Sequence, residues 1–358
     1  MATIELSDIA HCYPGAGDSY ALKPLSVKWE DGKRYAILGP SGCGKTTMLN
    51  IMSGLITPSQ GRVLFDGVDV TEQATSQRNI AQVFQFPVIY GTMTVGDNLA
   101  FPLRCRNVSL EKIKTKVGEV SELLGLESLL EKTANKLTAD QKQLISLGRG
   151  LVRDDVAAIL MDEPLTVIDP DLKWRLRRKL KQVNEEYKLT LIYVTHDQNE
   201  AMTFADEVAV MNDGNLVQKD EAVELFENPT DEFVSYFIGA PPMNLINCEA
   251  VNEFSVRMGE ANIAVKCSLN ASDHALKLGI RPEFVQIGES VNQENSVKVS
   301  VKRIEDLGNF KIVTCNYRGT DIKIKIPRNT NVEMKELVIR FPIDKVKIFS
   351  AGRLLGSS

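Results

Sequence analysis

Histidine is scarce in this 358-residue chain, and long apolar runs are absent from it. The three histidines, His11, His196 and His274, are not grouped with cysteines in any zinc-site pattern. No stretch approaches the ~18 apolar residues that would indicate a membrane span. Residues 1–14 lack a basic segment followed by an apolar run, so we expect no signal peptide. If the protein acts at a membrane, we expect a partner to cross it.

The six cysteines are scattered, and none belongs to a CxxC pair. This scatter favours free thiols in a reducing compartment. Acidic residues (47) outnumber lysine and arginine (42), and the formal net charge is -5. A protein that binds nucleic acid usually carries a broad basic field. The charge therefore argues against DNA or RNA as a partner.

Two regions of the chain differ in their periodicity. Over the first two thirds, short apolar runs alternate with helical patterns, which predicts an α/β core with a largely parallel sheet. A helical block at about residues 90–155 interrupts the core, and we expect it to form an inserted subdomain. After residue 240 the apolar residues recur with a period of two, as in Val297, Val299 and Val301. This pattern predicts a small all-β barrel or sandwich over residues 241–358.

A glycine-rich loop is the strongest local signal. The segment fits the pattern G-x-x-x-x-G-K-[ST] and lies between an apolar strand and a helical pattern; it reads Gly39, Pro40, Ser41, Gly42, Cys43, Gly44, Lys45 and Thr46. Backbone N–H groups of such a loop surround phosphate oxygens, and the following helix N-terminus favours the anion. We expect Lys45 to reach the terminal phosphates and the Thr46 hydroxyl to bind Mg²⁺. A glycine-rich turn without a ligand is the alternative.

Polar side chains follow three other apolar strands. One strand leads into Asp162, which can support Mg²⁺, and Glu163, which can orient and deprotonate an attacking water. His196 follows a second strand, where ligands bind at the edge of an open α/β sheet. Gln85 ends a third, and its amide can contact both Mg²⁺ and the water. Each signal is weak alone, since acids often end strands and a lone histidine is more often structural.

In order and spacing these motifs resemble the ABC ATPase family over about residues 3–240. The family has a P-loop NTPase core with an inserted helical subdomain, and its members bind and hydrolyse ATP with Mg²⁺. The resemblance implies a P-loop that extends to Thr47, a Q-loop at Gln85, Walker B residues Asp162 and Glu163, a D-loop at Asp169 and a switch histidine at His196. Tyr13 lies where the family usually has an aromatic residue that stacks on adenine, and a core tyrosine is the alternative.

The C-terminal region resembles the maltose-type importer ATPases, which carry an OB-like regulatory domain there. Residues 237–244, residues 279–283 and the closing strands carry this likeness. The resemblance implies domains at 1–240 and 241–358 and a place at the cytoplasmic face of the bacterial inner membrane. It implies two transmembrane permease subunits and, indirectly, a solute-binding protein as partners. Glycerol is the solute that overall likeness favours; another sugar, glycerol phosphate or a similar solute is the alternative.

The signature motif departs from the family. Where the family has Leu-Ser-Gly-Gly-Gln, the chain has Leu137 followed by Thr138, Ala139, Asp140 and Gln141. In the family, each signature faces the γ-phosphate bound to the other subunit's P-loop. At about 5 Å and an effective dielectric near 20, Asp140 would repel it by on the order of 3 kcal/mol per unit charge. Thr138 could keep the hydroxyl of the motif, and Thr138-x-x-Gln141 is an acceptable capping box.

This departure suggests an asymmetric pair in which a second, different ATPase chain supplies the usual signature. The site on the P-loop of this chain would then hydrolyse ATP, and the site that Asp140 faces would be degenerate. A well-capped helix with normal function is the alternative. Two other classes also stay open: a soluble ABC ATPase of repair or translation, and an ATP-binding regulatory partner without hydrolysis. The intact Glu163 argues against the second of these.

Overall fold

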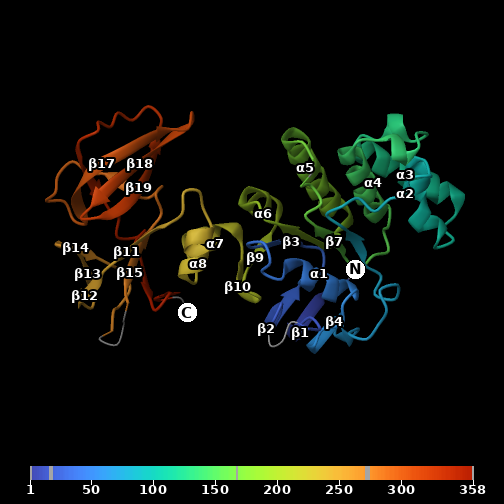
Figure 1. The fold of residues 1–358 in the computed structure, drawn as a ribbon, viewed down its shortest axis with the longest axis horizontal. Helices are drawn as coiled ribbons and strands as arrows, with labels where there is room; N and C mark the ends of the chain where they lie inside the picture. Colours follow the sequence, from blue (N-terminus) through green and yellow to red (C-terminus); the bar gives the residue numbers. More distant parts are fainter. Residues whose placement is uncertain (1, 16–18, 167, 271–274, 357–358) are drawn as a thin grey trace. The chain divides into compact units, whose positions relative to one another are not determined.

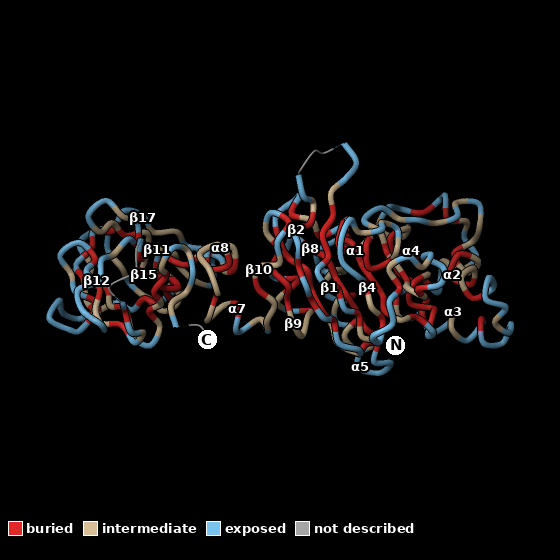
Figure 2. The backbone as a smooth tube through the Cα atoms, turned by 90° about the horizontal axis from the view of Figure 1, so that it is seen from below, coloured by how far each residue is buried: buried red, intermediate tan, exposed pale blue. Residues whose placement is uncertain are grey.

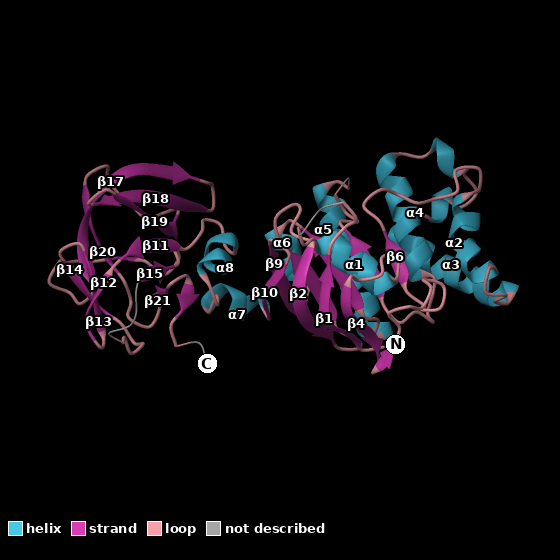
Figure 3. Cartoon of the chain, turned by 60° about the horizontal axis from the view of Figure 1, so that its bottom comes forward, coloured by secondary structure: helices cyan, strands magenta, loops and turns pink. Residues whose placement is uncertain are grey.

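The computed structural model describes residues 2–15, 19–166, 168–270 and 275–356 (Figure 1). The chain divides into two compact units, Met1–Ala222 and Val223–Ser358. The first unit combines sheets with helices on the pattern of an α/β protein. The second consists of β-sheets and two short helices (Figure 3). Both expected fold classes are therefore confirmed. None of the helices in these ranges is long and apolar enough to cross a membrane.

A six-stranded sheet of order β10-β9-β3-β8-β7-β6 forms the centre of the first unit. Its strands are β3 (Arg34–Leu38), β6 (Ala81–Val83), β7 (Ile159–Asp162), β8 (Leu191–Thr195), β9 (Glu207–Asn212) and β10 (Asn215–Asp220). All neighbours pair in parallel except β9 and β10. Every residue of β7 and β8 is buried (Figure 2), as expected for parallel strands covered on both faces. Because these strands run in one direction, their carboxyl ends meet at one edge of the sheet.

A second, antiparallel sheet of order β2-β1-β4-β5 packs in the same unit. Its strands are β1 (Ile4–His11), β2 (Leu22–Trp29), β4 (Gln60–Phe65) and β5 (Val68–Asp69). One hydrophobic core combines side chains of this sheet, of the central sheet and of α1 (Lys45–Ser53). Trp29 and Tyr35 meet edge to face within it, with ring centroids 4.9 Å apart. This core holds the start of α1, and with it the loop after β3, against the central sheet.

The predicted helical block forms as an inserted subdomain. It comprises α2 (Val95–Arg104), α3 (Leu110–Leu124), η1 (Glu127–Leu129), η2 (Ala134–Lys136) and α4 (Ala139–Leu151), after which come α5 (Pro170–Tyr187) and α6 (Gln198–Phe204) of the core. Thr94 and Ser109 cap α2 and α3 by accepting backbone N–H groups. A Cβ atom at Gly148 would lie 2.5 Å from a methyl carbon of Leu99. Glycine at this position therefore lets α2 and α4 approach closely.

The second unit contains three antiparallel sheets, of orders β11-β15-β21-β22, β12-β13-β14 and β16-β20-β17-β18-β19. The strands are β11 (Asn244–Asn247), β12 (Glu249–Asn252), β13 (Ser255–Met258), β14 (Ala261–Ala264), β15 (Lys277–Ile280), β16 (Gln286–Ile287), β17 (Ser296–Asp306), β18 (Phe310–Tyr317), β19 (Thr320–Pro327), β20 (Glu336–Arg340), β21 (Lys347–Ser350) and β22 (Arg353–Leu354). The alternating residues Val297, Val299 and Val301 are buried in a hydrophobic core of this unit. The period of two thus identified the inward face of β17.

The second unit also includes α7 (Ala222–Glu227) and α8 (Glu232–Phe237). The second compact unit begins at Val223, and the domain bounds 1–240 and 241–358 stay a prediction. Arg281, at the end of β15, is only 1% exposed. Its guanidinium donates to the carbonyl oxygens of Phe226 (3.0 Å), Ser235 (2.9 Å) and Ile238. Burial lowers the pKa of Arg281 to about 10, so it stays charged at neutral pH and binds both helices to the β unit.

Replacing Arg281 with methionine should destabilise the second unit. Arg281→Met removes the charged donor from three carbonyl groups, of which those of Ser235 and Ile238 are buried, and we expect it to cost about 3 kcal/mol or more in the free energy of unfolding. Arg257→Met is the control, because Arg257 is half-exposed and pairs with Glu249 on the surface; its cost should stay below about 1 kcal/mol. Urea titration read by hydrogen exchange in residues 223–358 measures both. Equal effects of the two variants would contradict the role of Arg281.

Candidate nucleotide-binding and hydrolytic site

The loop between β3 and α1 forms a backbone cradle at the carboxyl edge of the central sheet. Gly42 and Gly44 have φ angles of +81° and +102°, which L side chains rarely adopt. A Cβ atom at Gly39 would lie 2.3 Å from the carbonyl oxygen of Met211. The glycines are thus required by conformation and by close approach. The loop leads directly into the nine-residue helix α1, whose N-terminus carries a partial positive charge.

Lys45 lies within this cradle and is only 6% exposed. Its ammonium donates to the carbonyl oxygens of Gly39 (2.8 Å) and Pro40 (2.9 Å). Burial raises the pKa of the neighbouring Cys43 thiol, so Cys43 stays neutral there. The cradle therefore combines the buried Lys45 ammonium with a glycine-rich backbone turn at a helix N-terminus, and both features suit a phosphate group.

Thr46 and Asp162 form a pair of oxygen ligands beside the loop. The Thr46 hydroxyl donates to Oδ1 of Asp162 across 3.3 Å, and Asp162 ends β7 with 8% of its surface exposed. Burial raises the pKa of Asp162, while the Thr46 hydroxyl and the charge of Lys45 act against this rise. A hydroxyl next to a carboxylate is a donor set that Mg²⁺ prefers, usually together with phosphate oxygens and waters. The residues present therefore fit Mg²⁺.

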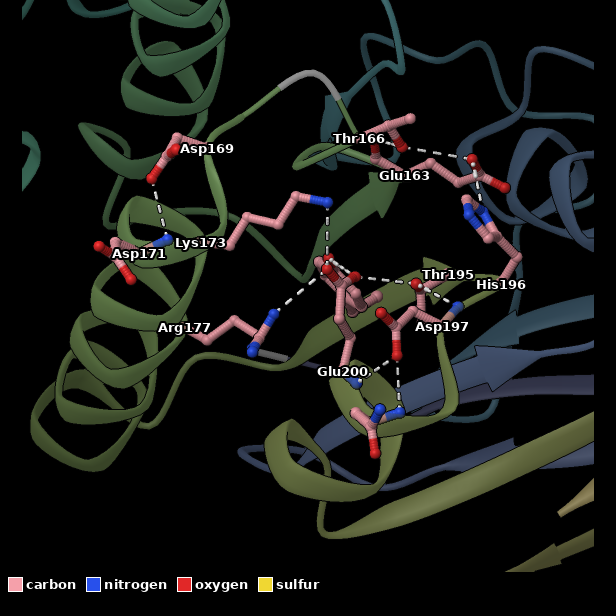
Figure 4. A network of polar contacts seen from close by, with 12 residues as sticks. Glu163, Thr166, Asp169, Asp171, Lys173, Arg177, Thr195, His196, Asp197 and Glu200 are labelled. Atoms are coloured by element: carbon pink, nitrogen blue, oxygen red, sulfur yellow. Dashed lines mark hydrogen bonds and ion pairs between the residues drawn. The ribbon is translucent and has the colours of Figure 1, made fainter. Parts of the chain in front are cut away.

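Glu163 brings three sequence-predicted residues together. Its Oε2 lies 3.1 Å from Nδ1 of His196 and accepts a 3.4 Å hydrogen bond from Nε2 of Gln85. Thr166 donates to the backbone carbonyl of Glu163 at 3.0 Å, and Figure 4 shows the side chains of Glu163, Thr166 and His196 close to one another. Glu163 itself has a φ of 46°, a left-handed conformation that is uncommon outside glycine. Such backbone strain clusters at sites where chemistry fixes the geometry.

Tyr13 lies beside the glycine-rich loop. Its hydroxyl is 3.0 Å from Oγ1 of Thr47, in the first turn of α1, and either oxygen can donate. The ring packs edge-on against His11, with centroids 4.7 Å apart, yet the residue is 43% exposed. Tyr13 is thus not a core tyrosine. Its ring is available to a planar group bound next to the loop.

The signature residues form a separate cluster at the start of α4. Gln141 accepts a 3.2 Å hydrogen bond from the N–H of Thr138, which completes the expected capping box. The Thr138 hydroxyl donates to Asp140, and this hydrogen bond holds the pKa of Asp140 below its usual value. Ala139 beside them is exposed. The sequence suggested that Thr138 keeps the hydroxyl of the motif. In the structure this hydroxyl is bound to the ionised carboxylate of Asp140.

Asp169 lies at the start of α5, and Glu200 lies next to the turn that carries His196. Asp169 caps α5 by accepting the N–H of Asp171 at 2.9 Å. Glu200 is 5% exposed and lies under the His196 turn, in contact with Thr195. Sequence reasoning missed Glu200. The available signal was weak, because an acid three residues after Asp197 suggests an ordinary capping box.

These features together define a P-loop ATPase with an inserted helical subdomain. The family described as ABC transporter matches residues 22–166. The chain is 37% identical to the trehalose/maltose import ATP-binding protein MalK of Thermococcus litoralis, over 98% of both chains. It is 34% identical to the sn-glycerol-3-phosphate import ATP-binding protein UgpC 2 of Rhizobium johnstonii, over 94% of this chain and 93% of that one.

A third relative is the osmoprotective compounds uptake ATP-binding protein GgtA of Synechocystis, at 35% identity over 99% of this chain and 98% of that one. Among solved structures, the ATP-binding cassette MJ0796, a dimer bound to ADP and Pi, matches with a TM-score of 0.57 and 28% identity. The match covers 61% of this chain and 98% of the cassette. The chain belongs to the import ATP-binding proteins of the ABC transporter family, and it is an ATPase.

Asp162→Asn should raise the thermal midpoint of the nucleotide-free protein at pH 7. Because the folded pKa of Asp162 lies above its unfolded value, ionisation costs stability as the pH rises between the two, and asparagine removes that cost. The difference should shrink as the pH falls below both pKa values. Mg²⁺ with ATP should stabilise the variant less than the wild type.

Scanning calorimetry over a pH series measures these midpoints. Asp213→Asn is the matched control, because the Asp213 side chain is 82% exposed. It should leave the midpoint unchanged at each pH. A lowered midpoint in Asp162→Asn at pH 7 would show that its carboxylate stabilises the fold, contrary to this account.

Proposed function

We propose that this chain is the ATP-hydrolysing subunit of an importer of a small carbohydrate or polyol, at the cytoplasmic face of a bacterial inner membrane. The contact of Glu163 with His196 and Gln85, beside the phosphate cradle, carries this proposal. A cradle alone would bind a nucleotide. A carboxylate next to it, contacted by an imidazole and an amide, can also activate a water. This arrangement favours an enzyme over a regulatory nucleotide-binding partner.

In the proposed mechanism the loop amides and Lys45 bind the β- and γ-phosphates of ATP. Bound Mg²⁺ would supply charge neutralisation there, held by Thr46, Asp162 and Gln85. Glu163 orients the attacking water and accepts its proton. His196 holds the Glu163 carboxylate in position relative to the γ-phosphate. The Tyr13 ring stacks on adenine. Binding and hydrolysis then favour different conformations, and that difference drives transport.

An exposed apolar segment after Gln85 supports membrane subunits as partners. Phe86 is 73% exposed, Val88 53% and Tyr90 41%. Arg149 supports the segment from α4: its guanidinium donates to the Val88 carbonyl at 2.7 Å and lies 4.8 Å from the centre of the Tyr90 ring. We propose that two transmembrane permease subunits bind here and that a solute-binding protein delivers the solute to them. The relatives' import functions favour this over an ATPase of repair or translation.

The solute itself is the finer part of the proposal. The relatives are named for trehalose and maltose, for sn-glycerol-3-phosphate and for osmoprotective compounds. These are polyhydroxylated or otherwise small polar solutes. We propose glycerol, which is a small polyhydroxylated solute too, as the solute of this importer. Another sugar or glycerol phosphate is the alternative. Uptake of radiolabelled glycerol by cells with and without the chain distinguishes them.

We propose further that the ATPase pair is asymmetric. In the dimer that the family resemblance implies, Asp140 faces the γ-phosphate bound by the other subunit. The ionised Asp140 carboxylate and its hydrogen bond to Thr138 support this, because the hydroxyl is turned to Asp140. A different ATPase with the usual signature would serve the complete P-loop of this chain. The second site would bind ATP poorly or hydrolyse it slowly.

Glu163→Gln should lower ATP turnover by about 100-fold or more, because it removes the proton acceptor while keeping the size of the side chain. ATP affinity should stay within about threefold, since Lys45 and the loop bind the phosphates. Steady-state phosphate release and binding of a fluorescent ATP analogue measure the two quantities. Unchanged turnover would favour the regulatory partner without hydrolysis.

Asp140→Gly should raise ATP affinity or turnover at the second site of the purified complex. The removed repulsion, on the order of 3 kcal/mol, corresponds to about 100-fold before Mg²⁺ offsets part of it. Asp140→Asn is the matched variant: it removes the charge, keeps the size and should give most of the same increase. If neither variant changes either quantity, Asp140 does not impair the second site.

A further inference from the structure

Glu200 is a buried acid whose carboxylate is shared between two elements of the first unit. Oε2 accepts hydrogen bonds from the hydroxyls of Tyr193 (2.7 Å) and Thr195 (2.9 Å), both on β8. Oε1 lies 3.2 Å from the Arg177 guanidinium and 3.6 Å from the Lys173 ammonium, both on α5 (Figure 4). Both oxygens are thus fully used by two neutral donors and two cations.

On the β8 side, these contacts fix the turn that carries His196. Thr195 immediately precedes His196 and donates to Glu200. The same Thr195 oxygen accepts the backbone N–H of Asp197 at 3.0 Å. Asp197 in turn caps α6 through the N–H groups of Asn199 and Glu200. Glu200 therefore orients the Thr195 hydroxyl, and that hydroxyl in turn binds the backbone of Asp197 on the other side of His196.

On the α5 side, the contacts hold the helix just after the D-loop. Asp169 caps this helix, and its carbonyl oxygen accepts the N–H of Lys173 at 2.8 Å. Lys173 and Arg177 are one helical turn apart, so both side chains reach the same carboxylate. The segment that joins Glu163 to α5 thus ends at a helix whose first two turns are bound to Glu200.

Stability alone does not explain such a cluster. Desolvation of buried charges commonly cancels their attraction, so apolar replacements of similar size often fold as well or better. The cluster instead fixes geometry, because each donor must lie in one position to reach the Glu200 carboxylate. Burial and the nearby Glu200 charge raise the pKa of Tyr193 well above its ordinary value, so the phenol remains a donor.

We infer that Glu200 is a positioning residue for hydrolysis, which holds the His196 turn and the first turns of α5 in one fixed relation. The inference rests on the ATPase role of Glu163 and His196. Through Thr195, Glu200 sets where the imidazole meets Glu163; through Lys173 and Arg177, it makes that position depend on α5 and hence on the D-loop. Glu200 itself touches neither the cradle nor the reacting groups.

The His196 signal is read on the full chain labelled with ¹³C in its histidines, and ATP turnover is measured on the purified complex. The sequence has three histidines, so the His196 signal is identified by its loss in His196→Ala. Glu200→Gln keeps an acceptor for the β8 hydroxyls but removes the charge that binds α5. We expect it to shift the His196 signal. Turnover should fall about 10-fold with KM for ATP within twofold, because misplacement affects a step after binding.

Arg177→Gln breaks the cluster from the α5 side and should move the His196 signal in the same direction. The double variant should be far from additive, since both changes remove one contact. Asp206→Asn is the matched control: Asp206 pairs with the mostly buried Arg34 at the start of β3, away from His196. It should leave the His196 signal in place and turnover within twofold.

An unmoved His196 signal in Glu200→Gln and Arg177→Gln overturns the inference, whatever the turnover. A moved signal with turnover unchanged from the wild type overturns it as well, because positioning would then not matter for hydrolysis. Absence of turnover in the wild-type complex would instead count against the proposed function, while the His196 signals of the two variants still decide whether Glu200 holds His196. Thermal midpoints of all variants show that each one folds.

Discussion

The whole site depends on keeping a carboxylate ionised at the buried end of β7. Asp162 is almost fully covered, and burial raises its pKa. The Thr46 hydroxyl and the charge of Lys45 oppose this, and both come from the start of α1. Strand, loop and helix α1 must therefore stay in one arrangement for a divalent cation and a phosphate to bind together. The two sheets and their shared core provide that arrangement.

The next residue in the chain, Glu163, supplies the carboxylate that can activate a water at this binding site. Glu163 leaves β7 in a left-handed conformation and meets His196 from the neighbouring strand. At the start of α4, Asp140 accepts a hydrogen bond from Thr138, in the motif where the resemblance implies glycines. One chain thus combines a complete P-loop half with an altered signature half. From this difference between its two halves we propose that the chain pairs with a different ATPase.

Sequence alone predicted the cradle, the Asp162–Glu163 pair, His196 and both fold classes, because each depends on local pattern and spacing. It did not predict features that arise from long-range contacts of single buried charges. The Arg281 guanidinium, for example, binds carbonyls of two helices 46 to 55 residues earlier in the chain. The sequence did not predict the role of Glu200, because that role also depends on contacts with other elements of the fold. The capture of the Thr138 hydroxyl by Asp140 is local, but it needed side-chain geometry.

The mass of the intact transporter tests the account most directly. The chain would be tagged, extracted from native membranes in mild detergent and weighed in its complex by native mass spectrometry. The account predicts one copy of this chain beside a second, different ATPase and two membrane subunits. Two copies of this chain in one complex would place Asp140 in both sites and contradict the asymmetric pair.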